Sequence, residues 1–235
     1  MGLAKCREGK DRIAQVRGRS FSAYRTLAKR FNKQFPSSPL PIDPTYEEIA
    51  ELAVWVVEFG EGESCAQGTA FFLEGVGLVT ADHVLAELPP GKSADLCRPK
   101  APSVKFKVTP SSRRCEHRDL VILDHDVPPG AYLVLPEATS PKSTNDDIIA
   151  LGFPDYGPGD ELSKRPGKII ARPTKHGVKL IEVSAMLSGG ISGGPIVNDR
   201  YQVVGIAQRG GNGEHKQLAV EISELLKLAT EPTSA

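Results

Sequence analysis

Short apolar runs separated by turn residues fill the sequence from residue 53 onward, and they constrain the fold more than any other feature. The runs are rich in β-branched and aromatic residues, and Gly or Pro separates many of them, in a chain with 23 Gly and 19 Pro. Many short strands punctuated in this way are typical of all-β sandwiches and barrels. We therefore expect an all-β, barrel-like fold with strands at residues 53–59, 69–73, 78–80, 104–108, 120–123, 132–135, 148–152, 167–171, 179–183, 195–197, 202–207 and 217–220.

Helical patterns stand at both ends of this series. Apolar side chains recur every three or four residues over residues 20–34, which predicts a helix. The prolines within residues 36–44 then favour an extended linker. Thr45 and Glu48 fit a capping box that opens another short helix. Residues 222–229 have one apolar face and are expected to form a short C-terminal helix.

Charge is balanced over the whole chain but not along it. The 29 basic and 29 acidic side chains cancel, whereas residues 1–44 hold ten basic and three acidic ones and so carry +7. Such an arm can bind nucleic acid, an anionic membrane or an acidic protein, can serve as a transit peptide, or can remain a solvated helix. Because the chain as a whole is neutral, no specific nucleic-acid binding is predicted. For the basic residues 1–44, the interaction we expect is with a regulatory protein partner.

Several classes of protein are excluded by what the sequence lacks. No run of 18 apolar residues is present, so no membrane-spanning helix is expected, and no apolar signal-peptide region follows the start. The five histidines show no metal-ligand spacing, so we expect neither a metal nor another cofactor. Four scattered cysteines without Cys-x-x-Cys spacing argue against a disulfide scaffold and favour a reduced, cytoplasmic protein. They are Cys6, Cys65, Cys97 and Cys115.

Three short segments carry side chains with chemistry, each beside apolar, strand-like residues. In chain order they read Thr80-Ala-Asp-His83-Val, Asp119-Leu-Val-Ile-Leu123 and Gly190-Ile-Ser192-Gly-Gly-Pro195. Together they supply a histidine, an aspartate and a serine. A serine hydroxyl is a weak nucleophile that needs a base, and the base needs a group that orients it and stabilises its cationic form. This combination predicts nucleophilic catalysis by a serine.

These segments resemble the motifs of the chymotrypsin/trypsin-like serine peptidases, especially the disulfide-poor bacterial type that includes the HtrA-like proteases. The order agrees, with 36 residues from His83 to Asp119 and 73 from Asp119 to Ser192. The resemblance implies two six-stranded antiparallel β-barrels. The first is expected within residues 45–128, and the second, with the C-terminal helix, within residues 129–235. Residues 1–44 remain a basic helical arm and linker outside the resemblance.

The resemblance also implies roles for single residues. Ser192 would attack the peptide carbonyl, His83 would accept its proton, and Asp119 would hold the imidazole. The amides of Gly190 and Ser192 would form the oxyanion hole, and the glycines around them give the loop the freedom to turn both amides inward. No cofactor is needed for this chemistry.

Other aspartates compete with Asp119 for the third role. Asp82 adjoins the histidine, and Asp124 and Asp126 lie a few residues further on. Asp119 is preferred because the apolar run that follows it would bury its carboxylate against the imidazole. Asp82 is expected to point away, since neighbours on an extended segment face opposite sides.

Departures from the family pattern bear on regulation and specificity. Val84 stands where secreted members have a bridged cysteine, and Ile191 stands where zymogens have an aspartate, so activation by N-terminal cleavage is not expected. The primary pocket lacks a carboxylate, which disfavours Lys or Arg at P1 and favours a small or apolar residue; Arg209, turned inward, would favour an acidic one. By position, the pocket consists of Met186 at its base with Leu187, Ala207, Gln208, Arg209 and Gly210.

The function expected from the sequence is that of an intracellular serine endopeptidase acting on protein or peptide substrates. The alternative is a binding module that has the protease fold without turnover. A further hypothesis, compatible with the first, is that residues 1–44 tether the enzyme or place it under the control of a partner.

Overall fold

The computed structural model describes residues 26, 28–30, 32–33, 44–60, 65–139, 143–210 and 216–231. The chain divides into two units, one of residues 1–45 with 128–131 and one of residues 46–127 with 132–235. In the first unit, residues 26, 28–30 and 32–33 are helical and fall inside the predicted helix at 20–34. The rest of that helix and the linker up to residue 43 lie outside the described residues. Over the described ranges, no helix has the length and apolar character needed to cross a membrane.

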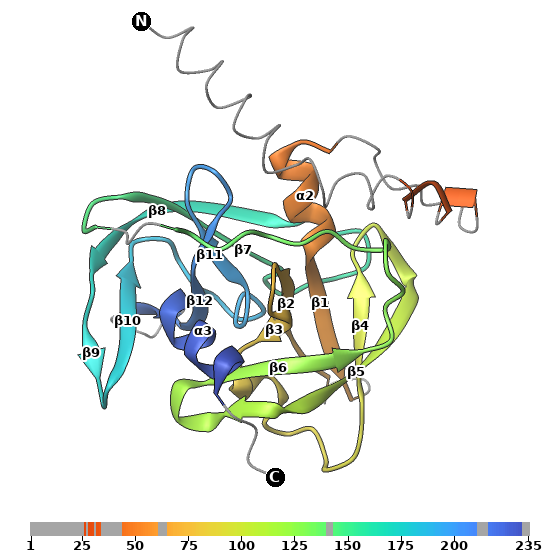
Figure 1. Ribbon diagram of the computed structural model, residues 1–235, viewed down its shortest axis with the longest axis horizontal. Helices are drawn as coiled ribbons and strands as arrows, with labels where there is room; N and C mark the ends of the chain where they lie inside the picture. The colour runs from red at the N-terminus through yellow and green to blue at the C-terminus, as the bar shows by residue number, and fades with distance from the viewer. Residues whose placement is uncertain are drawn as a thin grey trace, which may run out of the picture. The chain divides into compact units, whose positions relative to one another are not determined.

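Six antiparallel strands of the second unit close into a barrel (Figure 1). The barrel order is β1-β2-β3-β6-β5-β4. Helix α2 (Tyr46–Ala53) leads directly into it, as the predicted short helix requires. The strands are β1 (Val54–Phe59), β2 (Ala66–Leu73), β3 (Gly77–Thr80), β4 (Ala94–Arg98), β5 (Ala101–Cys115) and β6 (Leu120–His125).

The remaining strands form a second barrel. Their order is β13-β12-β11-β7-β8-β10-β9, and pairing of β13 with β10 closes six of them, with β9 alongside β10. Helix α3 (Ile222–Thr230) follows as the predicted C-terminal helix. The strands are β7 (Asp147–Gly152), β8 (Ser163–Ala171), β9 (Thr174–Lys175), β10 (Val178–Val183), β11 (Pro195–Val197), β12 (Val203–Arg209) and β13 (Gln217–Glu221).

The all-β fold of two six-stranded antiparallel barrels is confirmed, but the strand prediction is wrong at residues 132–135 and misses β4 and the two-residue β9. Residues 132–135 do not form a strand; only Leu135 makes an isolated bridge, to Leu73. Their apolar character reflects burial instead, since the Tyr132 ring stacks on Phe72 with 3.7 Å between ring centroids. Conversely, β4 was not predicted, because its charged residues interrupt the apolar pattern used to recognise strands. In the structure it pairs with both β1 and β5.

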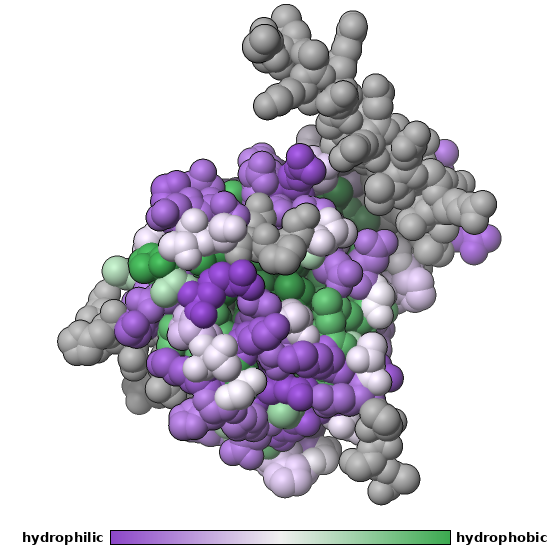
Figure 2. All heavy atoms as spheres, turned by 60° about the vertical axis from the view of Figure 1, so that its left-hand side comes forward, coloured by the Kyte–Doolittle hydropathy of each residue, from purple (hydrophilic) through white to green (hydrophobic). Residues whose placement is uncertain are grey.

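Apolar side chains are largely withdrawn from the surface. Figure 2 shows one face on which hydrophilic side chains predominate and apolar ones show only in patches between them. Among the described residues, the large hydrophobic side chains with marked exposure are Val134, Ile170 and Met186. The buried side chains form two clusters, one of which draws on strands of both barrels. The barrels are therefore packed against each other, which holds the loops between them in fixed positions.

Candidate active site

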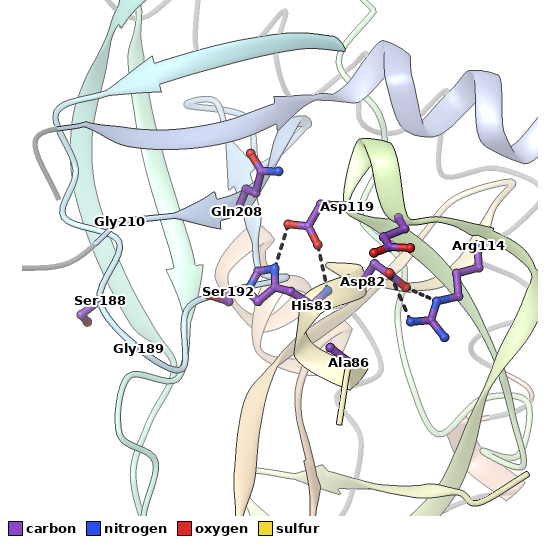
Figure 3. A pocket seen from close by; sticks show the side chains of 11 residues that line it. Asp82, His83, Ala86, Arg114, Asp119, Ser188, Gly189, Ser192, Gln208 and Gly210 are labelled. Atoms are coloured by element: carbon purple, nitrogen blue, oxygen red, sulfur yellow. Dashed lines mark hydrogen bonds and ion pairs between the residues drawn. The ribbon is translucent and has the colours of Figure 1, made fainter. Parts of the chain in front are cut away.

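His83 is positioned where β3 ends and a short 3-10 helix (Asp82–Leu85) begins. Its Nδ1 lies 2.7 Å from Oδ2 of Asp119, and its backbone N–H donates to Oδ1 of the same carboxylate over 2.8 Å. Both carboxylate oxygens therefore contact the one histidine (Figure 3). The His83 side chain is 45% exposed and that of Asp119 only 13%, so the ring faces the cavity while the carboxylate is sheltered behind it.

Asp119 occupies a tight turn between a 3-10 helix (Glu116–Arg118) and β6. Its φ of 55° and ψ of 47° are left-handed, a conformation that aspartate adopts more readily than most residues. The Asp119 N–H donates to the Glu116 carbonyl over 3.0 Å, which fixes the turn. The turn aims the carboxylate at the histidine.

The competing aspartates do not contact the imidazole through any hydrogen bond among the described residues. Asp82 is buried and pairs with Arg114 of β5, whose Nε lies 2.5 Å from Oδ1, so it points away from the imidazole as expected. The reason differs from the one we gave, since Asp82 begins a 3-10 helix and is not on an extended segment. Asp126 accepts the Lys107 N–H over 2.8 Å, and Asp124 is exposed on β6.

Ser192 lies in a glycine-rich loop that precedes β11. Gly193 has φ of 83°, and a Cβ there would meet the backbone N of Ala81 at 2.9 Å and the Thr80 and Thr69 oxygens still closer, so only glycine fits. The Gly193 N–H donates to the Ala207 carbonyl, and the Ala207 N–H donates to the Gly194 carbonyl, both over 2.8 Å. These bonds hold the loop against β12.

The backbone around Gly190 is held in the same way. Gly190 has φ of 84°. The Ile191 carbonyl accepts the Gly194 N–H over 2.8 Å, and because a trans peptide points its N–H opposite to its C=O, this also orients the Ser192 amide. The Ile191 N–H donates to the Ser188 carbonyl over 3.2 Å.

Thr69 of β2 contacts the serine loop, a position that the sequence did not reveal. Its side chain is fully buried, and its Oγ1 donates to the Gly190 carbonyl over 2.6 Å and accepts the Phe153 N–H over 3.1 Å. Its backbone N–H donates to the Ser192 carbonyl over 2.9 Å. One residue of the first barrel thus holds both ends of the serine turn. The signal available in the sequence was a hydroxyl placed within an apolar strand, where a buried polar group needs partners.

A cavity of about 660 Å³ brings the three motif residues together (Figure 3). Residues of both barrels form its wall, and Ser192 lies beside the His83 ring. Within the described ranges, no group of three or more His, Cys, Asp or Glu side chains has an arrangement suited to a metal ion. The lining residues are Asp82, His83, Ala86, Arg114, Glu116, Asp119, Ser188, Gly189, Ser192, Gln208 and Gly210.

The residues predicted for the primary pocket are only partly at this cavity. Gln208 and Gly210 line it, whereas Leu187 and Ala207 are buried behind the wall. Met186 is 49% exposed, which is not the environment of a pocket base. The Arg209 side chain lies outside what the structure describes.

Comparisons with known proteins identify the family and agree with the two-barrel fold. The family model for a trypsin-like peptidase domain matches residues 68–206. Similar solved structures include the active form of the Rv3671c protease from M. tuberculosis (20% identity, 80% of this chain and 86% of that chain, TM-score 0.65). A serine endoprotease from Yersinia pestis is also similar (18% identity, 80% of this chain and 66% of that chain, TM-score 0.63). No curated protein matches the sequence.

Proposed function

The chain belongs to the trypsin-like peptidase family and is a serine endopeptidase, and from this premise we propose that Ser192, His83 and Asp119 are its catalytic triad. The observation that carries the proposal is the double contact between His83 and Asp119, with Nδ1 to Oδ2 at 2.7 Å and N–H to Oδ1 at 2.8 Å. A carboxylate at Nδ1 keeps the proton on that nitrogen, so Nε2 is free to act as a base. Ser192 lies beside this ring in the same cavity.

The proposed reaction proceeds through an acyl-enzyme. Ser192 Oγ attacks the peptide carbonyl while His83 Nε2 takes its proton, and the Asp119 carboxylate stabilises the resulting imidazolium. His83 then protonates the leaving amine as the C–N bond breaks. A water molecule, deprotonated by His83 in turn, attacks the acyl group and releases the acid and the free serine.

The amides of Gly190 and Ser192 are proposed to bind the oxyanion. Their support is the fixed loop backbone: the Gly194 N–H engages the Ile191 carbonyl, which orients the Ser192 amide, and Thr69 Oγ1 engages the Gly190 carbonyl, which holds the Gly190–Ile191 peptide between the two donors. Donors held in place before the reaction stabilise developing charge without reorganising, and one such donor is worth roughly 3–4 kcal/mol in another protease.

The substrate is a protein or peptide, since that is what a serine endopeptidase cleaves. We propose that it binds at Gln208 and Gly210, the two predicted pocket residues that line the cavity, with the buried Leu187 and Ala207 behind them. A carboxylate is absent from this set, in line with the proposed preference against Lys and Arg at P1. The location we propose is the cytoplasm, supported by the free state of the described cysteines, Cys65, Cys97 and Cys115.

Residues 1–44 are proposed to dock a regulatory protein partner, because they carry +7. A full-length variant with the arm's basic residues replaced by Gln tests this against the natural chain. If cell extract changes active-site labelling of the natural chain but not of the variant, the arm has the proposed role. An equal response of both proteins would refute it.

The triad is tested by labelling with a fluorophosphonate probe. The probe needs an activated serine and a formed oxyanion hole, and it needs no knowledge of the substrate. We expect labelling of the natural chain and of Asp124→Asn, which changes an exposed carboxylate outside the cavity, but not of Ser192→Ala. A folded natural chain that stays unlabelled, with and without cell extract, would instead favour a binding module without turnover.

A further inference from the structure

We propose that Gln217, at the start of β13, closes the primary specificity slot and restricts P1 to small side chains. The inference rests on the proposed function, because it concerns which residue precedes the bond that Ser192 attacks. Gln217 was not among the residues predicted for the pocket. Its role follows from contacts between segments that lie on either side of the serine.

The slot lies between two stretches of the second barrel that both reach the cavity. Ser188 and Gly189 line the cavity from the segment before Ser192, and Gln208 and Gly210 line it from the end of β12 and the residue that follows. A substrate whose carbonyl lies at Ser192 has to place its P1 side chain between these two walls. The width of the gap between them therefore sets the size of the P1 residue.

The two walls are in contact just behind the cavity. A Cβ on Gly210 would lie 2.7 Å from both the Cβ and the carbonyl oxygen of Leu187, and closer still to Oε1 of Gln217. Real Cβ atoms essentially never approach another heavy atom within 3.0 Å. Gly210, Leu187 and the Gln217 amide therefore fill this space, and a long P1 side chain has no room to enter it.

The amide of Gln217 is held in this position. The Leu187 N–H donates to its Oε1 over 2.7 Å, and Leu187 itself is buried. The Gln217 backbone pairs with Val183 of β10. Moving the amide aside would leave the Leu187 N–H without its acceptor, and an unsatisfied buried donor is costly. The slot is thus closed in the resting protein by a hydrogen bond rather than by a loose side chain.

Recognition of an acidic P1 residue is the competing interpretation. Arg165 of β8 is the described cation at this wall, and its Nη1 donates to the Met186 carbonyl and to Ser188 Oγ, both over 2.9 Å. Its guanidinium thus braces the rim of the slot from the Ser188 side. The contacts of Gln217 favour exclusion by size, and an acidic P1 residue becomes an outcome of the test.

The test uses peptidyl diphenyl phosphonates that differ only at P1, which carries the side chain of Ala, Val, Leu, Phe or Glu. Each forms a P–O bond to Ser192 as phenol leaves, so its inactivation rate measures access of that P1 side chain to the slot. Rates are divided by the rate of a fluorophosphonate that has no P1 side chain, measured on the same protein. The proteins are the full natural chain, Gln217→Ala, Gln217→Met and, as a matched control, Lys216→Ala, whose side chain pairs with Glu182 at the surface.

For the natural chain we expect the Ala probe to react at least about tenfold faster than the Leu and Phe probes, the discrimination typical of a pocket that rejects extra methylenes. Gln217→Ala should lower that ratio by about tenfold. Gln217→Met keeps the bulk but not the acceptor for the Leu187 N–H, so its ratio should lie between those of the natural chain and Gln217→Ala. Lys216→Ala should retain the natural ratio. Fluorophosphonate labelling of each variant shows that its site is formed.

Four results overturn the inference while leaving the proposed function intact. They are equal rates for Ala and Leu in the natural chain, an unchanged ratio in Gln217→Ala, a fastest rate for Glu, and no reaction of the Ala probe with a protein that the fluorophosphonate labels. Absence of fluorophosphonate labelling in the natural chain overturns the proposed function, and the inference with it.

Discussion

Replacing Thr69 by valine should slow catalysis without touching any residue of the triad. The change preserves the shape of the side chain but removes the Oγ1 donor to the Gly190 carbonyl at 2.6 Å and the acceptor of the Phe153 N–H at 3.1 Å. Each buried backbone group left unsatisfied costs about 1–3 kcal/mol, so the free energy of unfolding should fall by about 2–6 kcal/mol before any relaxation. The bond from the Thr69 N–H to the Ser192 carbonyl does not depend on the side chain and should persist.

The effect on the rate has an upper limit set by the oxyanion hole. Complete loss of one donor costs about 10²–10³ in kcat in another protease. Freeing the Gly190–Ile191 peptide acts on the two proposed donors only through the adjoining backbone, so it should cost less than that, and we expect kcat to fall by about tenfold to a hundredfold with KM nearly unchanged. The assay is steady-state cleavage of a peptide with P1 alanine at a temperature where all variants are folded, together with the affinity of a peptide boronic acid, which mimics the tetrahedral intermediate.

Two control variants separate positioning from stability. Thr69→Ser keeps Oγ1 and should retain most of kcat. Trp55→Phe removes a buried hydrogen bond, from Trp55 Nε1 to the Leu52 carbonyl over 2.8 Å, at a residue that does not line the cavity, so it should lower stability but not boronate affinity. If Thr69→Val lowers stability yet keeps kcat and boronate affinity within about twofold of the natural chain, the reasoning is wrong.

Three further predictions follow from the same contacts. Asp119→Asn should keep the fold but favour the wrong imidazole tautomer, and kcat should fall by about 10⁴ with an unchanged melting temperature; a loss below tenfold would contradict the assigned role. Gly68→Cys combined with Val84→Cys should form a disulfide, because a Cβ at residue 68 lies 2.6 and 3.0 Å from the Val84 γ-carbons. Closing a loop of about 15 residues should add about 3 kcal/mol in denaturant titrations without reductant, and an equal midpoint with and without reductant would refute this. Burial lowers the pKa of His125 in the folded protein. Below about pH 6.5 the unfolded chain therefore binds the proton more readily, and the free energy of unfolding decreases as the pH is lowered. His125→Phe should flatten this part of the plot of stability against pH, and an unchanged slope would exclude the histidine as its source.

The fold class could be predicted from the sequence because apolar, β-branched runs mark buried segments, and most strands here are buried. The errors in the strand prediction arise because burial and strand pairing do not always coincide. Residues 132–135 are apolar since Tyr132 stacks on Phe72 and Leu135 is buried, yet this segment makes only one bridge and no ladder. Strand β4 contains Asp95, whose carboxylate pairs with Lys107 on the neighbouring β5. An exposed ion pair across two strands does not appear as an apolar run, so composition alone did not reveal β4.

The proposed triad could be named from the sequence because each member lies in a short local motif. Thr69 and Gln217 have no such motif: the Thr69 contact joins residues 121 positions apart, and the Gln217 contact joins residues 30 positions apart. A hydroxyl or an amide becomes functional at these sites only through what the fold places beside it. Met186 illustrates the reverse, since its position in the sequence suggested a pocket base and its side chain is half exposed.

Thr69 and Gln217 contact different parts of the site, so we expect the rate of cleavage and the selectivity for P1 to depend on different residues. The serine loop is held mainly by backbone bonds, from Gly193 to Ala207 and from Gly194 to Ile191, and Thr69 Oγ1 adds the side-chain bond to Gly190. Gln217 contacts Leu187 and Gly210 instead, outside that loop. A change at residue 69 should therefore alter the rate for every P1 residue by a similar factor. A change at residue 217 should alter the ratio between P1 residues while the fluorophosphonate rate, which depends on the serine and its oxyanion donors, stays close to that of the natural chain.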